Sequence, residues 1–173
     1  MVLGTRTLTV IAGAGVTAPL GPFQRLSLAR SLYAAKRGLG PLIQLEEGDV
    51  LSLVGALCSV AGASLEAPPS TRQRDCERQL LRALPRKAKK QLAERARPVR
   101  DAPARPDVWV RAANASLDRV AAVAVGDASV ILADAPAREL ASAAQEDRAR
   151  RLLRFMLSPE FEGLRQRFGV SVQ

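Results

Sequence analysis

The sequence predicts a mainly α protein, α+β at most: a compact domain of about eight short helices with one or two short N-terminal strands. Three observations lead to this fold class. The hydrophobic content is 47%, but aromatic residues contribute only 3%, so Ala, Leu and Val dominate, and Ala and Leu are strong helix formers. Apolar residues recur at helical spacing along most of the chain. The length of 173 residues fits a single domain, 1–173.

The N-terminal elements are one strand and one helix. Residues 5–13, TRTLTVIAG, alternate Thr with apolar residues and predict a strand. A loop rich in Gly and Pro follows as far as Pro22. Residues 23–38, FQRLSLARSLYAAKRG, have helical apolar spacing, and Gly38 is a typical helix-ending residue. Residues 41–45, PLIQL, are consistent with a second short strand.

The middle of the chain predicts three helices. The acidic group at 46–49 favours a helix N-terminus, and the apolar run 49–62 that follows predicts a central, buried helix. After a loop at 63–70, Thr71 is the predicted cap of a helix. Its apolar face is expected to comprise Cys76, Leu80, Leu81 and Leu84. Pro85 then starts a basic helix at about 86–97, and the proline-rich run 98–107 predicts an exposed connection.

The last third of the chain predicts four helices. The longest starts at Pro106 and ends at Gly126, and a short helix follows at 127–135. The apolar stripe expected on the longest helix comprises Val110, Ala113, Leu117, Val120 and Ala124. Residues 138–158 form the next helical pattern, with Leu140, Ala144, Leu152, Phe155 and Met156 on its buried side. Ser158 and Pro159 then cap and start a final helix that carries Phe161, Leu164 and Phe168 and stops at Gly169.

The positive charge of the chain is concentrated in one segment. The net charge is +9, and residues 70–106 alone hold twelve basic and four acidic residues. Such asymmetry points to a partner, so we expect this segment to face one. The residues expected to bind it are Arg86, Lys87, Lys89, Lys90, Arg95 and Arg97. Two other interpretations remain open: nonspecific binding to nucleic acid or an anionic surface, and a solvated helical face without a partner. No aromatic residue interrupts the segment, so the stacking platforms of single-strand binders are missing from it.

The sequence offers little catalytic chemistry. It has no histidine, which excludes Ser-His-Asp and Cys-His mechanisms and histidine metal ligands. Gly13, Gly15 and Ala18 formally fit a dinucleotide-binding loop, but that loop needs a helix to start directly behind it, and Pro19 and Pro22 prevent one. We therefore expect no catalytic residue, cofactor or metal. An enzyme that binds NAD or a nucleotide at 13–15 is kept as a third hypothesis.

Three further features have a structural and a functional interpretation. Asp118, Arg119 and Asp127 form a candidate polar cluster, either a buried Arg–Asp pair that fixes two helices or a pair of catalytic carboxylates. Cys76 lies among basic neighbours and is either a structural cysteine or a slightly activated thiol. Trp109 is typical of a packing anchor or an interface edge.

Four segments of the chain follow one another in an order that is also found in another protein domain. They are FQRLSLARSLYAAKRG, LPRKAKKQL, VWVRAANASLDRVAAVAVGDASVILA and LLRFMLSPEFEGLRQRFGV. In this order the chain resembles an uncharacterised domain at the C-terminal end of large tetratricopeptide-repeat proteins of bacteria. Trp109, Arg111, Asp118, Arg119, Gly126 and Asp127 carry the resemblance. It implies a module that works near a scaffold, and it leaves open whether the chain is a stand-alone copy or a fragment.

Together these observations predict a non-catalytic helical interaction or assembly module, with a protein as the expected partner of residues 70–106. Nucleic acid or an anionic surface is the alternative partner. Two cysteines and no apolar run of membrane-spanning length favour a cytoplasmic protein, with export as the alternative. The sequence does not specify the oligomeric state.

Overall fold

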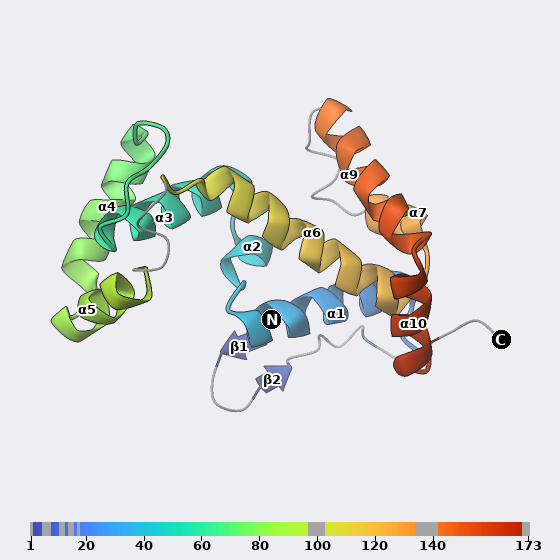
Figure 1. Cartoon of the computed structure of the whole chain (residues 1–173). Coiled ribbons are helices and arrows are strands. Elements are labelled where there is room, and N and C mark those ends of the chain that lie inside the picture. Colours follow the sequence, from blue (N-terminus) through green and yellow to red (C-terminus); the bar gives the residue numbers. More distant parts are fainter. Residues whose placement is uncertain are drawn as a thin grey trace. The chain divides into compact units, whose positions relative to one another are not determined.

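The computed structural model (Figure 1) describes residues 2–4, 8–10, 13, 16, 18–96, 103–133 and 142–170. The part of the chain so described is mainly helical, which confirms the predicted class. The chain divides into two compact units, one made of residues 1–43 and 113–173 and the other of residues 44–112. The single domain 1–173 stays a prediction.

The first unit begins with two short strands and a helix. β1 (Val2–Gly4) pairs antiparallel with β2 (Leu8–Val10), with Val2 opposite Val10. α1 (Pro22–Arg37) starts with a proline in its first turn, and the side-chain oxygen of Gln24 accepts a hydrogen bond from the Gly21 amide at 2.9 Å. At the other end Gly38 takes a φ of 69°, a left-handed conformation that glycine adopts without strain. The predicted helix at 23–38 is therefore confirmed.

Four helices complete the first unit: the later part of α6 (Pro106–Val125), α7 (Ala128–Leu132), α9 (Ser142–Met156) and α10 (Pro159–Arg167). Their core contains Leu26, Ala121, Ala122, Ile131, Leu152, Phe155 and Phe161. The rings of Phe155 and Phe161 meet edge to face, with centroids 5.5 Å apart. On α6 the fully buried residues are Ala121 and Ala122, whereas Val120 and Ala124 of the predicted stripe are only half-buried.

The ends of the last helices lie close to the predicted positions. Gly126 has a φ of 78° and follows α6 directly. The Ser158 hydroxyl accepts a hydrogen bond from the Phe161 amide, and Pro159 opens α10. Phe168 was expected on the buried stripe but is 70% exposed. It is the residue at which α10 ends, so its side chain no longer follows the helical stripe. The side chains of Leu140 and Ala144 lie outside the described residues.

The prediction of a second strand at residues 41–45 is wrong. The segment forms the short helix α2 (Pro41–Gln44), with backbone bonds from Leu42 to Leu39 and from Ile43 to Gly40. A proline at the first helical position has the φ that a helix needs and has no amide to leave unsatisfied. An apolar run this short does not by itself distinguish the two structures.

The second unit is built on α3 (Glu47–Val60), α4 (Thr71–Ala83) and α5 (Arg86–Arg95). α3 was expected to be buried all round, but only Val50, Gly55 and Ala56 are buried and its other apolar side chains are half-buried. α4 packs closely on one side of it: a Cβ at Gly55 would lie 2.6 Å from the Gln73 side chain. The absence of a side chain at Gly55 thus permits the close contact between the helices.

Two local features fix the helices of the second unit. Ser70, not Thr71, caps α4, since its hydroxyl accepts from the Gln73 amide at 3.2 Å; the predicted cap was one residue late. The segment before α6 is joined to the loop after α3 by a one-residue parallel bridge between Leu65 and Ala104 and by an ion pair of 2.6 Å between Arg105 and Glu66. Among the described residues, no helix has the length and apolar character that crossing a membrane requires.

Candidate partner-binding surface

Exposed cations gather on α4 and α5 in the second unit. Six of them have no acidic partner among the described residues, and we call these six the basic surface: Arg74, Arg82, Arg86, Lys87, Lys90 and Arg95. Other cations of the same unit are neutralised, since Arg72 pairs with Asp49 and Arg78 with Asp75. The positive charge of α4 and α5 is therefore only partly balanced within the fold.

The sequence of α5 explains why its cations are exposed. Ala88, Leu92 and Ala93 are half-buried and form the inner side of the helix, which leaves positions 86, 87 and 90 on the outside. Lys89 differs from the other predicted partner-binding residues. It is half-buried, and its Nζ donates a hydrogen bond of 2.5 Å to the Leu81 carbonyl near the end of α4. Lys89 thus ties α5 to α4, and Arg97 lies outside the described residues.

Arg74 and Arg82 were not singled out from the sequence. Both lie within the basic run 70–106, and together with Arg78 they recur every four residues along α4. That spacing is the signal that could have found them. Their contribution extends the candidate surface from α5 onto the exposed face of α4.

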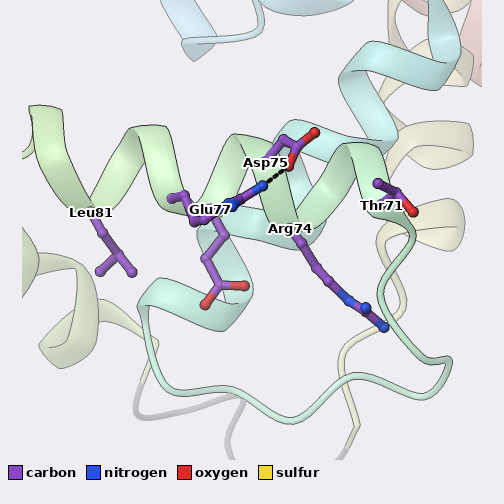
Figure 2. A pocket seen from close by; sticks show the side chains of 6 residues that line it. Thr71, Arg74, Asp75, Glu77 and Leu81 are labelled. Carbon is purple, nitrogen blue, oxygen red and sulfur yellow. Dashed lines mark hydrogen bonds and ion pairs between the residues drawn. The ribbon is translucent and has the colours of Figure 1, made fainter.

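A shallow hollow lies along this face of α4 (Figure 2). Its lining residues all come from α4: Thr71, Arg74, Asp75, Glu77, Arg78 and Leu81. Arg74, Glu77 and Leu81 project to the same side of the helix. Leu81 is 44% exposed, so its predicted place on the apolar face is wrong, because a helical residue points about 100° away from its neighbour, here the less exposed Leu80. Small-molecule sites are enclosed by several elements, so a hollow lined by one helix suits contact with a macromolecular surface.

The predicted polar cluster of Asp118, Arg119 and Asp127 does not form. Asp118 is buried at 7% exposure and accepts hydrogen bonds from Arg30 of α1 at 2.6 Å and from Arg148 of α9 at 2.7 and 2.8 Å. Arg119 is exposed, and its guanidinium lies over the Phe155 ring, 5.4 Å from the centroid. Neighbouring residues of a helix point about 100° apart, which explains why Asp118 is buried and Arg119 is not.

Asp127 has a separate, local role. It is exposed beyond the end of α6, and its carboxylate accepts hydrogen bonds from the Ser129 amide and hydroxyl at 2.8 and 2.7 Å, which caps α7. These bonds lower the pKa of the Asp127 carboxyl. Asp118 and Asp127 therefore have separate roles, one in a buried ion pair and one in a helix cap. The interpretation as a buried Arg–Asp pair that fixes helices agrees with Asp118, but its partners are Arg30 and Arg148 in place of Arg119.

The glycine loop and the two cysteines are the other residues for which the sequence allows a chemical role. Gly13 is exposed, and its carbonyl accepts from the Val16 amide at 3.0 Å, whereas Gly15 lies outside the described residues. Both cysteines are free. Burial raises the pKa of the Cys58 thiol, and burial followed by the negative charge of Asp49 raises the pKa of Cys76, which is the opposite direction from an activated thiol. Within the described ranges, no three His, Cys, Asp or Glu side chains are placed to hold a metal ion.

Comparison with known proteins gives no relative. The chain matches no protein-family model, and it has no significant match among curated proteins or solved structures. The functional proposal therefore rests on the residues of the chain itself.

Proposed function

We propose that this chain is a non-catalytic helical interaction module that binds an acidic protein partner through the basic surface of α4 and α5. The observation that supports it is the set of six exposed cations without acidic partners among the described residues. An acidic partner would supply the missing counter-charges, and electrostatic complementarity of this kind speeds association and selects partners. The resemblance to a domain at the end of tetratricopeptide-repeat proteins agrees with such a role, and the two free cysteines agree with a cytoplasmic location.

One observation favours a protein over nucleic acid. α4 exposes Leu81, an apolar side chain of the kind that the centre of a protein interface buries. Nucleic acid stays the second candidate because unbalanced cations alone are sufficient for nonspecific phosphate binding.

The proposal is tested by capture of proteins on the immobilised full chain from a nuclease-treated lysate of the cells that make it. The test variant replaces Arg86, Lys87 and Lys90 by Glu. The matched control replaces three other exposed arginines by Glu and therefore changes the net charge by the same amount. They are Arg150 and Arg154 of α9 and Arg167 of α10. We expect a protein that wild type and control capture and the test variant does not.

The alternative functions predict other results. The same capture is repeated from an untreated lysate, and a protein that is captured only without nuclease would assign the basic surface to nucleic acid. Equal capture by all three chains would exclude the basic surface as the binding site. Thermal stabilisation by millimolar NAD or nucleotide would contradict the non-catalytic interpretation and support the enzyme hypothesis.

A further inference from the structure

The loop between α3 and α4 borders a second hollow of the second unit, with a volume of about 250 Å³. Its walls come from α3, from this loop and from the starts of α4 and α6, so several elements border it, as in sites that bind a ligand. A cavity of roughly 150 Å³ accepts a benzene molecule, so this hollow has room for one Leu or Pro side chain. We call it the proline hollow. Its apolar walls are Leu51, Leu65, Ala67, Pro68 and Pro106.

Two polar side chains at the start of α4, Ser70 and Gln73, also line the proline hollow. Nε2 of Gln73 is buried and has no hydrogen-bond partner within the described residues, which costs free energy. The last torsion of a glutamine side chain is soft, so Nε2 can turn toward the hollow. The hydroxyl oxygen of Ser70 accepts from the Gln73 amide, which leaves the hydroxyl hydrogen to donate in another direction. A carbonyl oxygen in the hollow would give both donors an acceptor.

The charge of the proline hollow favours an uncharged occupant. Among the described residues that line it, Asp107 alone is charged. Its carboxylate already accepts a hydrogen bond of 2.7 Å from Arg111 and lies 3.8 Å from Arg105. A cationic group would have to compete with these two arginines, and an anionic group would meet the charge of Asp107. A peptide main chain supplies the carbonyl oxygen without a charge.

We propose that the proline hollow binds an uncharged, extended peptide segment of a partner protein. An apolar side chain of the segment fills the space between the apolar walls, and a main-chain carbonyl beside it accepts hydrogen bonds from Gln73 and Ser70. The segment is extended because the carbonyls of a helix are bonded within the helix. This contact goes beyond the proposed function and uses none of the cations of the basic surface, so the two proposals can fail separately.

The probe is the peptide Thr-Thr-Leu-Thr-Thr with both ends blocked, which carries no charge and favours an extended backbone because of its β-branched residues. A second peptide has Gly in place of Leu. Binding to the ¹⁵N-labelled full chain is followed by NMR titration. We expect the Leu peptide to bind about tenfold more tightly than the Gly peptide, because it buries an apolar side chain, and to shift the side-chain amide signals of Gln73.

Two variants test the two parts of the contact. Gln73→Met keeps an unbranched side chain and removes the amide, so it should weaken binding of the Leu peptide about fivefold, as loss of one hydrogen bond does. It should not lower the melting temperature, because the amide that it removes has a buried N–H group without a partner within the described residues. Ala67→Phe fills the hollow from an exposed position and should abolish binding. Ala83→Phe is the control, since Ala83 is exposed on α4 and does not line the hollow.

Several results would overturn the inference. They are equal affinity for the two peptides, no saturable binding at millimolar peptide, and wild-type affinity in the Ala67→Phe or the Gln73→Met chain. The chain in which Glu replaces Arg86, Lys87 and Lys90 should bind the Leu peptide as wild type does. If it does not, the basic surface binds the peptide and the proline hollow does not. If it does while no protein is captured on the immobilised chain, the hollow stands and the proposed function fails.

Discussion

At the scale of the residue, Asp118 is the point at which three helices of the first unit are joined. Its carboxylate binds Arg30 of α1 and Arg148 of α9 from its position on α6. Taking such charges out of water costs as much as their attraction returns, so a buried group of this kind contributes more to the specificity of packing than to net stability. Removal of one member is nevertheless costly, because the remaining charges stay buried.

We expect Asp118→Ala to lower the free energy of unfolding by about 3–5 kcal/mol, measured by urea denaturation. The substitution takes away the counter-charge that Asp118 supplies to two buried guanidinium groups. Asp147→Ala is the control, since Asp147 forms an exposed pair with Arg151 one turn away on α9 and such pairs contribute about 0.5 kcal/mol or less. Equal losses for the two variants would show that burial of Asp118 has no energetic consequence.

The second residue-scale prediction concerns Gly126. Its φ of 78° is a left-handed conformation, and a Cβ there would lie 2.5 Å from the guanidinium of Arg165, which donates a hydrogen bond of 3.0 Å to the Val123 carbonyl. Gly126→Ala should therefore destabilise by about 2–4 kcal/mol, from backbone strain and from displacement of a charged hydrogen bond. In contrast, Gly163→Ala should stabilise by about 0.5–1 kcal/mol, because nothing lies within 4 Å of its Cβ in α10. Thermal melts of the two variants should shift in opposite directions.

The partners of Asp118 could not be predicted from the sequence. Arg30 is 88 residues away along the chain, and the sequence contains many arginines that could have taken its place. The sequence places Arg119 next to Asp118, yet consecutive residues of a helix point about 100° apart, so their side chains do not meet. The identity of the partners of Asp118 is decided by packing alone.

At the scale of the element, the sequence signals at two helix ends correctly predicted where these helices end or begin. Gly38 ends α1 and Ser158 caps α10 as predicted, because the hydrogen bonds at a helix end involve residues within four positions of one another. The short segment at 41–45 has no such unambiguous signal, and its helix was missed. The extent of burial of α3 was also missed, since it depends on how much of the helix α4 and α5 cover.

The cap of α7 makes a prediction about pH. Hydrogen bonds from Ser129 lower the pKa of Asp127 in the folded protein, so near pH 4 and below the unfolded state binds more proton at this carboxyl than the folded state does. The stabilisation by the charged cap is therefore present above about pH 4 and is lost as the pH falls through the folded-state pKa. We expect Asp127→Ala to lower the melting temperature clearly at pH 7 and to differ less from wild type at pH 2.5.

Ser158→Ala provides the comparison for this cap. Ser158 also caps a helix, but its hydroxyl does not titrate in this range, so the loss of melting temperature should be the same at both pH values. A difference between Asp127→Ala and wild type that stays constant from pH 7 to pH 2.5 would show that the charge of Asp127 does not contribute to the cap.

At the scale of the whole molecule, the net charge of +9 and its concentration in residues 70–106 could be read directly from the sequence. Which cations remain unbalanced could not. Arg72 and Arg78 are as basic as Arg74 and Arg82, but within the described part of the chain only the first two pair with an aspartate. The fold therefore decides which cations of the basic run are balanced and which are not.

The unbalanced cations lead to a prediction about salt. If the six cations of the basic surface each neutralised one phosphate of duplex DNA, affinity would fall roughly a thousandfold between 50 and 200 mM salt. An interface with an acidic protein would also bury apolar surface such as the exposed Leu81, and burial of apolar surface does not weaken with salt in this way. We expect the amount of protein captured on the immobilised chain to fall far less over this range than the amount of a 20-base-pair duplex that it binds. A fall as steep for the captured protein as for the duplex would mean that charge alone holds the partner, because only an apolar contribution can flatten the salt dependence of a surface that carries the same six cations.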